Sequence, residues 1–196
     1  MQVLSRQELQ RFLIQAKADG YFELFLLDLS TGLRRGELLA LQWSDLDLDT
    51  GTLSVTKQVY EVNGKMQLSV PKTKASIRKL VLPPAVVEVF REYQKTADSR
   101  WLFPSPVKED APLTPGEAAR RLHGILERAG CKQVRFHDLR HPYVKHTTKI
   151  FSLRSMAFQA QAYPDARRKT RGACQLHRGG QSQSPVRPLC NRKRFS

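Results

Sequence analysis

Three short segments of this 196-residue chain carry residue types that can act on a phosphate group. In one of them, His137 and Arg140 are three positions apart, so on a helix they share one face. An imidazole can transfer a proton near neutral pH, and a guanidinium presents a planar fork that matches two non-bridging phosphate oxygens. The pair therefore suits phosphodiester chemistry, although two charges on the solvent face of an amphipathic helix explain it slightly better in isolation.

Two further segments supply cations. Arg34 follows a turn at Thr31-Gly32 between two apolar runs, where a long side chain can project from rigid elements. Lys72 and Lys74 lie between two strand-like runs, and a lysine at the tip of such a hairpin can act as a point charge toward a phosphate. Taken singly, Arg34 is explained better as a solvated charge in a turn. The two lysines are explained better as residues that protect the edge of a sheet from pairing.

The elements that must position these side chains are mostly helical. Helix starts are indicated by a capping box at Ser5 and Glu8 and by the sequence Thr-Pro-Gly-Glu that begins at Thr114. The apolar pattern predicts helices that begin after residue 5 and near residue 136, and helices over about 21–29, 35–43, 84–96 and 114–129. Asn63-Gly64 predicts a hairpin within 52–70, and residues 78–82 supply a third strand. The predicted fold class is α+β, mainly α, with a helical core and a small three-stranded antiparallel sheet.

The charge of the chain is large and unevenly distributed. Lys and Arg outnumber Asp and Glu by 33 to 18, a net charge of +15 that implies an acidic partner such as nucleic acid or an anionic membrane surface. Residues 149–196 hold 11 Lys and Arg and a single Asp, whereas residues 1–148 hold 22 Lys and Arg and 17 Asp and Glu. The last stretch also lacks a sustained apolar pattern. We therefore expect a domain at 1–148 and a basic, disordered tail at 149–196.

Several classes of protein are disfavoured by the sequence. No apolar run approaches the ~20 residues that span a bilayer, and the N-terminus lacks the apolar stretch of a signal peptide, so a soluble cytoplasmic protein is expected. Cys131, Cys174 and Cys190 are too few and too scattered for a disulfide framework or a zinc site. No structural metal or disulfide is therefore expected.

The order of the three segments resembles one known family. A turn arginine, a hairpin lysine and then His-x-x-Arg on a late helix resemble the catalytic domain of the tyrosine recombinase (phage integrase) family over about residues 3–141. The strings TGLRRGELLALQWSDLD and HDLRH carry this resemblance most specifically. It implies site-specific recombination or integration of double-stranded DNA through a covalent 3′-phosphotyrosyl intermediate, by a homo-oligomer on the DNA, with no metal and no nucleotide cofactor.

The resemblance also implies roles for five residues. Arg34 and Arg140 would clamp the scissile phosphate, and one preorganised donor of this kind contributes on the order of 3 kcal/mol. Lys72, in preference to the other lysine of its segment, would protonate the leaving 5′-oxygen, and His137 would act as general acid and base. Glu37 corresponds to a buried acid that supports the site from behind.

The chain departs from the family pattern after the HDLRH string. Pro142 follows directly and is expected to break the helix. The family's Leu-Gly-His segment and the nucleophilic tyrosine about nine residues beyond it do not occur at the expected positions, as after a frameshift or an insertion. Tyr163 lies in the loop-like sequence Gln-Ala-Tyr-Pro-Asp and is a poor candidate. The nucleophile therefore stays unknown, and we expect little or no strand cleavage.

Two other interpretations stay open. A non-catalytic DNA-binding module would use the basic surface and tail to bind backbone phosphates. An RNA-binding protein of ribosomal type would explain the charge equally well, but it gives no reason for the order of Arg, Lys and His-x-x-Arg. On the N-terminal side, we expect the helical core-binding domain that completes the family's grip on DNA to be absent.

Overall fold

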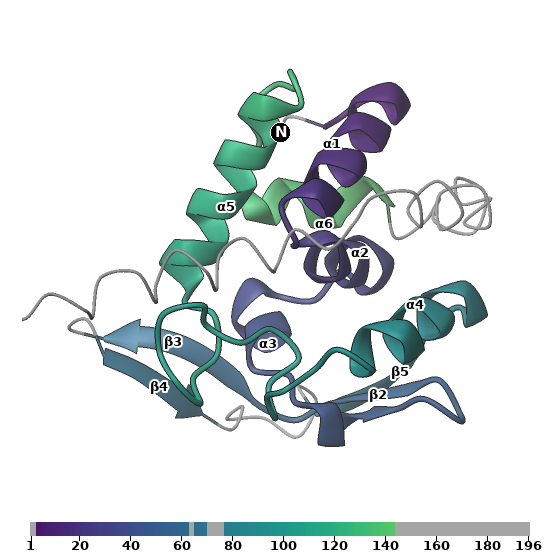
Figure 1. The fold of residues 1–196 in the computed structure, drawn as a ribbon, viewed down its shortest axis with the longest axis vertical. Coiled ribbons are helices and arrows are strands. Elements are labelled where there is room, and N and C mark those ends of the chain that lie inside the picture. Colours follow the sequence, from purple (N-terminus) through teal and green to yellow (C-terminus); the bar gives the residue numbers. More distant parts are fainter. Residues whose placement is uncertain (1–2, 63–64, 70–76, 144–196) are drawn as a thin grey trace, which may run out of the picture. The chain divides into compact units, whose positions relative to one another are not determined.

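The computed structural model describes residues 3–62, 65–69 and 77–143, with the backbone alone for residue 65 and for 140–143. Helices dominate this part of the chain (Figure 1). The α-helices are α1 (Arg6–Ala18), α2 (Phe22–Thr31), α3 (Arg35–Leu39), α4 (Pro84–Gln94), α5 (Pro115–Arg128) and α6 (Phe136–Tyr143). The shorter elements are the 3₁₀ turn η1 (Trp43–Asp45) and the strands β1 (Leu46–Asp47), β2 (Thr52–Val55), β3 (Gln58–Val62), β4 (Lys65–Ser69) and β5 (Arg78–Val81). No described helix is long and apolar enough to span a membrane.

The predicted helix ends are confirmed where the sequence carries a specific signal. The Ser5 hydroxyl accepts a hydrogen bond from the Glu8 backbone N–H at 3.2 Å, and the Ser5 backbone N–H donates to the Glu8 carboxylate at 2.7 Å. The bond from the Ser5 backbone N–H to the carboxylate, together with one from the Ser5 side chain, favours the charged form and lowers the pKa of Glu8 to about 2. Thr114 and Glu117 form the same reciprocal pair before α5. At the other end of a helix, Gly32 closes α2 in the left-handed conformation, with φ of 62°.

The strands form two small antiparallel sheets. β1, β2 and β5 make a three-stranded sheet in the order β1-β2-β5, and β3 pairs with β4 alone. The predicted hairpin is confirmed, because Val62 lies opposite Lys65 on the two sides of Asn63-Gly64. The strand-like run that precedes it is divided between β2 and β3. At this division Lys57 turns inward, with Nζ 3.1 Å from the Asp45 carboxylate and 2.8 Å from Gln42 Oε1.

Two helix boundaries differ from the prediction. The helix expected over 35–43 ends at Leu39, because the following residues pair with a distant strand-like segment instead. The Leu102 backbone N–H donates to the Leu41 carbonyl at 3.0 Å, and the Trp43 N–H donates to the Arg100 carbonyl at 3.0 Å. In α6 the helix includes Pro142 and reaches Tyr143, the last described residue. The break expected at Pro142 is therefore wrong at that position.

Aromatic side chains mark two parts of one continuous core. Phe25 of α2 lies between Phe12 of α1 and Phe136 of α6, with ring centroids 5.0 and 6.0 Å away. Nearer the sheet, the ring of Phe90 on α4 contacts three other aromatic rings, those of Trp43, Tyr93 and Phe103. Burial of large rings in edge-to-face contact supplies much of the hydrophobic stabilisation of a domain of this size. α2 contacts α1, α3, α4 and α6, so it lies at the centre of these helices.

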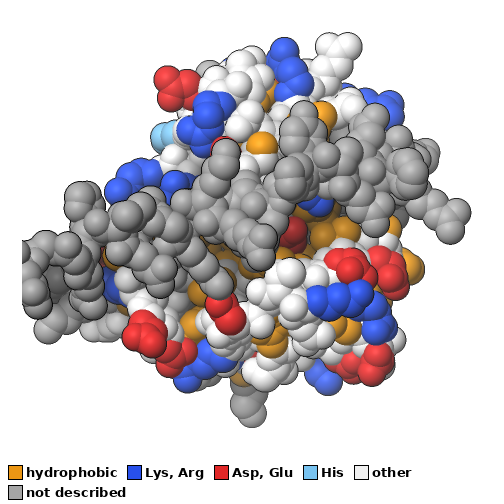
Figure 2. All heavy atoms as spheres, viewed as in Figure 1, with side chains coloured by type: hydrophobic (Ala, Val, Ile, Leu, Met, Phe, Trp, Pro, Cys, Tyr) orange, Lys and Arg blue, Asp and Glu red, His pale blue; other side chains and the backbone are white. Residues whose placement is uncertain are grey.

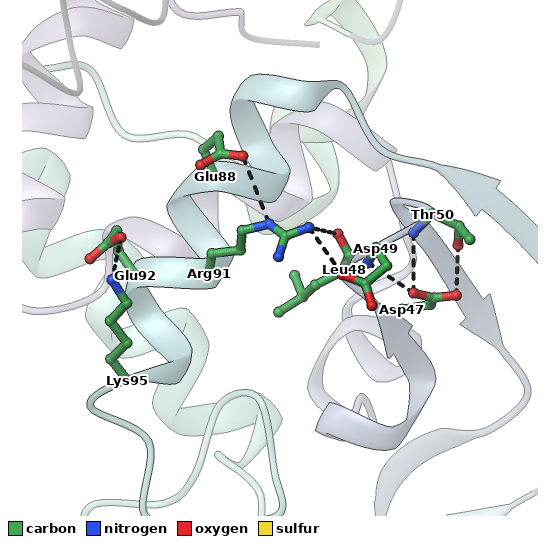
Figure 3. Close-up of polar contacts among 8 residues, drawn as sticks. All are labelled: Asp47, Leu48, Asp49, Thr50, Glu88, Arg91, Glu92 and Lys95. Atoms are coloured by element: carbon green, nitrogen blue, oxygen red, sulfur yellow. Dashed lines mark hydrogen bonds and ion pairs between the residues drawn. The ribbon is translucent and has the colours of Figure 1, made fainter.

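A polar network fixes α4 against the turn between β1 and β2 (Figure 3). The Asp47 carboxylate accepts hydrogen bonds from the backbone N–H groups of Asp49 and Thr50, at 2.9 and 3.2 Å, and from the Thr50 hydroxyl at 2.7 Å. Arg91 of α4 donates to the Leu48 carbonyl at 2.6 Å and pairs with the Asp49 carboxylate at 3.3 Å. The turn is thus closed by its own side chains and attached to the helix by one arginine.

A glycine allows α3 to lie unusually close to β3. A Cβ atom added at Gly36 would be 2.5 Å from the Val59 carbonyl oxygen, a backbone atom that cannot move without displacing the strand. Val59 itself is buried, so its side chain also anchors the strand. This close approach brings the N-terminal turn of α3 beside the sheet region.

We expect Gly36→Ala to lower the free energy of unfolding by about 1–3 kcal/mol, the usual range for overpacking. Urea denaturation followed by circular dichroism measures the change. Gly116→Ala is the matched control: a Cβ there meets nothing within 4 Å. Alanine in a helix is favoured over glycine by up to about 1 kcal/mol, so the control should be neutral or stabilising. A Gly36→Ala protein as stable as the wild type would contradict the proposed contact.

Candidate functional site

A buried carboxylate lies between two arginines at the start of α3. The Glu37 side chain is 2% exposed. Its Oε2 accepts a hydrogen bond from the Arg34 backbone N–H at 2.9 Å, and its Oε1 accepts one from Arg34 Nη1 at 3.2 Å. Arg78 donates from Nη1 to Oε1 at 3.1 Å and from Nη2 to Oε2 at 2.9 Å. Both oxygens are therefore shared between a turn residue and a residue of β5.

The local sequence explains why Arg34 faces outward. Gly32 ends α2, Leu33 inserts into the core with no exposure, and Arg34 is extended with φ of −67° and ψ of 144°. Leu38 on α3 is also fully buried, which fixes that short helix against the core. The Arg34 side chain consequently remains 62% exposed, although its backbone N–H and one guanidinium nitrogen are held by Glu37.

The charged state of Glu37 is stabilised by its neighbours. Burial of the carboxylate would raise its pKa, but hydrogen bonds from the Arg78 guanidinium and the Arg34 backbone N–H, together with both positive charges, outweigh burial and lower the pKa below the ordinary value of 4.5. The same pairing raises the pKa of Arg78. The cluster therefore holds two cations and one anion at neutral pH.

α6 presents His137 on a rigid support. Phe136 and Leu139 are 7% and 1% exposed, and α6 packs against α2 through these apolar positions. Asp138 is also buried, and its carboxylate accepts a hydrogen bond from Arg135 Nε at 3.0 Å, which lowers the pKa of Asp138. His137, one position away from the buried stripe, is exposed. The backbone places residue 140 three positions further along the same helix.

The structure thus describes only part of the predicted set. It brings Arg34 and Glu37 into contact and places His137 on α6, next to the helix that leads into Arg34. The side chain of Arg140, the lysine segment with Lys72 and residue Tyr163 lie outside the described residues. One contact was missed by the sequence analysis. Arg78 is 41 positions from Glu37, and no local pattern links them.

The described chain has little excess charge of its own. Its residues include 19 Lys and Arg against 17 Asp and Glu, so most of the +15 lies elsewhere in the sequence. On the face shown in Figure 2, the visible Lys and Arg side chains are interspersed with Asp and Glu. Within the described residues, no group of three or more His, Cys, Asp or Glu side chains could hold a metal ion. Attraction of an anion to this part of the protein therefore depends on individual positioned cations.

Residues 2–148 match the profile of the phage integrase family. The chain belongs to this family. Similar curated proteins include the XerC-like tyrosine recombinase of Caldanaerobacter subterraneus, which is 27% identical over 175 residues, spanning 77% of this chain and 44% of the relative. The ICEBs1 integrase of Bacillus subtilis is 26% identical over 126 residues, spanning 58% of this chain and 33% of the relative. The chain thus spans less than half the length of these relatives.

Solved structures of a recombinase and an integrase share the fold. The XerA recombinase superposes with a TM-score of 0.58 at 20% identity, over 89% of this chain and 64% of that protein. A lambda integrase dimer bound to a COC′ core site gives a TM-score of 0.52 at 18% identity, over 84% of this chain and 58% of that protein. The predicted fold class, mainly helical with a small antiparallel sheet, is confirmed.

The lowered pKa of Glu37 gives a pH-dependent prediction. Because the folded pKa lies below the ordinary glutamate value, the charged carboxylate stabilises the fold above that value, and this stabilisation is lost as the pH falls through the folded pKa. We expect Glu37→Gln to lower the free energy of unfolding by about 1–3 kcal/mol at pH 7, because it removes charged hydrogen bonds from a buried position.

Urea denaturation of both proteins between pH 7 and pH 3 measures this difference. It should stay constant down to about pH 5 and shrink below the ordinary glutamate pKa of 4.5, as the wild-type carboxylate becomes protonated. A difference that is independent of pH would show that Glu37 is held through packing alone.

Proposed function

We propose that this protein is a tyrosine recombinase by descent that binds double-stranded DNA and engages a backbone phosphate through Arg34. The observation that carries the proposal is the Arg34 guanidinium, 62% exposed yet held by the buried Glu37. A guanidinium fixed in this way can donate to a phosphate without losing much side-chain entropy on binding. Membership of the phage integrase family supplies the substrate class.

The proposed site comprises Arg34, Lys72, His137 and Arg140, with Glu37 behind Arg34. In a complete family member, a tyrosine hydroxyl attacks the phosphorus and the bond to the 5′-oxygen breaks, which leaves a 3′-phosphotyrosyl linkage and a free 5′-hydroxyl. His137, as general base, accepts the proton of the attacking hydroxyl, and Lys72 supplies a proton to the leaving 5′-oxygen. The two arginines stabilise the charge of the transition state. These steps need no metal and no cofactor.

Further parts of the proposal concern the chain beyond this site. We assign residues 1–148 to the catalytic domain and 149–196 to a basic tail that adds non-specific affinity for DNA. Assembly of a homo-oligomer on DNA is proposed by analogy with the family. Action on DNA would place the protein in the cytoplasm, as the sequence analysis predicts.

The second candidate is a DNA-binding module without cleavage activity. It is favoured by one observation: the Leu-Gly-His segment and the following tyrosine of the family pattern do not occur where they are expected. The two candidates share the phosphate contact and differ in the covalent step.

Arg34→Ala tests the shared phosphate contact. We expect weaker binding to a duplex DNA of fixed sequence, and a slope of log affinity against log salt that is smaller by about 0.9, the value for one neutralised phosphate. Fluorescence anisotropy from 50 to 300 mM salt measures both. Arg100→Ala is the matched control, because Arg100 is 60% exposed and also pairs with one carboxylate, that of Asp110 at 2.9 Å.

If both substitutions change the DNA affinity and its salt dependence equally, only the net charge matters. The proposed contact of Arg34 with a phosphate would then be wrong. A structured RNA of similar length serves as competitor. Preference for that RNA over duplex DNA would favour the RNA-binding interpretation instead.

A pool of nicked suicide duplexes with randomised sequence tests the covalent step. We expect no phenol-stable protein–DNA adduct from the full chain, because the tyrosine that should attack the phosphate is absent from its expected position. A gel shift of labelled DNA under denaturing conditions detects an adduct. If one forms and disappears in Tyr163→Phe, the protein is an active recombinase and the binding-module interpretation fails.

A further inference from the structure

Arg78 makes the more complete of the two arginine contacts with Glu37. Its two terminal nitrogens donate to the two carboxylate oxygens at 3.1 and 2.9 Å, the parallel fork geometry of a strong guanidinium–carboxylate pair. Arg34 reaches the carboxylate with one guanidinium nitrogen only, at 3.2 Å. The side chain of Arg78 is also the more enclosed, at 33% exposure against 62% for Arg34.

The backbone around Arg78 fixes where this fork lies. Arg78 is the first residue of β5 and pairs with Val55 of β2, whose side chain is fully buried. Glu37 lies on the short helix α3, which is packed closely against β3 through Gly36. The ion pair therefore joins two elements that are 41 positions apart in the sequence. It also places the first residue of β5 next to the support of Arg34.

Occupation of the carboxylate by Arg78 has a consequence for Arg34. A buried carboxylate needs its hydrogen-bonding capacity filled, and an exposed guanidinium three residues away would otherwise close on both oxygens. With Arg78 in place, Glu37 holds Arg34 by the backbone N–H and by one guanidinium nitrogen. The remaining donors of Arg34 are left to a ligand, and the cluster keeps one positive charge in excess.

We propose that Arg78 is a positioning residue, which holds Glu37 so that Arg34 presents its guanidinium to a DNA phosphate. This inference rests on the proposed function, because it assigns Arg78 a role only through the phosphate contact of Arg34. It differs from a direct contact of Arg78 with DNA and from a purely stabilising ion pair. These three roles give different patterns in a double-mutant cycle.

The experiment compares Arg78→Lys, Arg34→Ala and the double variant for affinity toward one labelled duplex DNA, with thermal unfolding of each protein as a check on folding. Lysine keeps the positive charge of Arg78 but lacks the planar pair of donors. The Arg78→Lys variant therefore preserves the electrostatic attraction to Glu37 and loses the two parallel hydrogen bonds. We expect Arg78→Lys and Arg34→Ala each to weaken binding by about tenfold, the scale of one charged contact, and the double variant to bind no more weakly than Arg34→Ala. Lys79→Gln is the matched control on the same strand; Lys79 is exposed, and its loss should change affinity by less than about twofold.

Each other pattern has a definite meaning. If Arg78→Lys binds as the wild type does, or if its effect multiplies with that of Arg34→Ala, Arg78 contributes charge or a direct contact and the inference is overturned. If Arg34→Ala itself binds as the wild type does, the proposed function fails and the role of Arg78 falls with it. Should Arg78→Lys unfold, Arg78→Gln and its double variant with Arg34→Ala replace it in the cycle. Unfolding of both single variants would show that the ion pair is structural and would also overturn the inference.

Discussion

The carboxylate of Glu37 is the constraint on which the arrangement at α3 depends. It is almost completely removed from solvent, so it must be paired, and the chain supplies two guanidinium groups and one backbone N–H for this purpose. These donors come from the turn after α2 and from β5, which otherwise belong to different layers of the fold. A single buried anion thereby fixes the orientation of the turn, the start of α3 and the edge of the sheet toward one another.

Close backbone packing makes this constraint possible. α3 is only five residues long, too short to be stable alone, and it is held by its buried leucines and by its contact with β3. Because a side chain at Gly36 would strike the Val59 carbonyl, only glycine allows the helix to approach so closely. Gly32 serves a related purpose, since its left-handed conformation turns the chain from α2 into the extended residues that precede α3. Two glycines thus define the backbone path through Arg34.

The sequence predicted the elements with local signals and missed those set by distant contacts. The capping residues Ser5 and Thr114 and the pair Asn63-Gly64 act within a few positions, so two helix starts and a hairpin could be placed correctly. The early end of α3 at Leu39 could not, because it results from pairing of Leu41 with Leu102. At the site, Arg34 and Glu37 were identified because the string TGLRRGELLALQWSDLD resembles the phage integrase family. Arg78 was missed, because nothing in its own strand marks it as the partner of a glutamate 41 positions earlier.

Two buried ion pairs of the fold differ in how far their cations are exposed to solvent. Lys57 pairs with Asp45, and both side chains are mostly buried, 18% and 11% exposed. The positive charge of Lys57 is therefore neutralised inside the protein by Asp45. Such a pair joins elements and presents nothing to a ligand. In the Glu37 cluster, one anion is shared by two cations, and the more exposed of them extends into solvent. Buried ion pairs contribute little net stability, since the cost of desolvation offsets most of the attraction, and apolar residues would stabilise the same position at least as well. A buried acid that leaves one arginine exposed and oriented is therefore explained better by the proposed phosphate contact of Arg34 than by the stability of the fold.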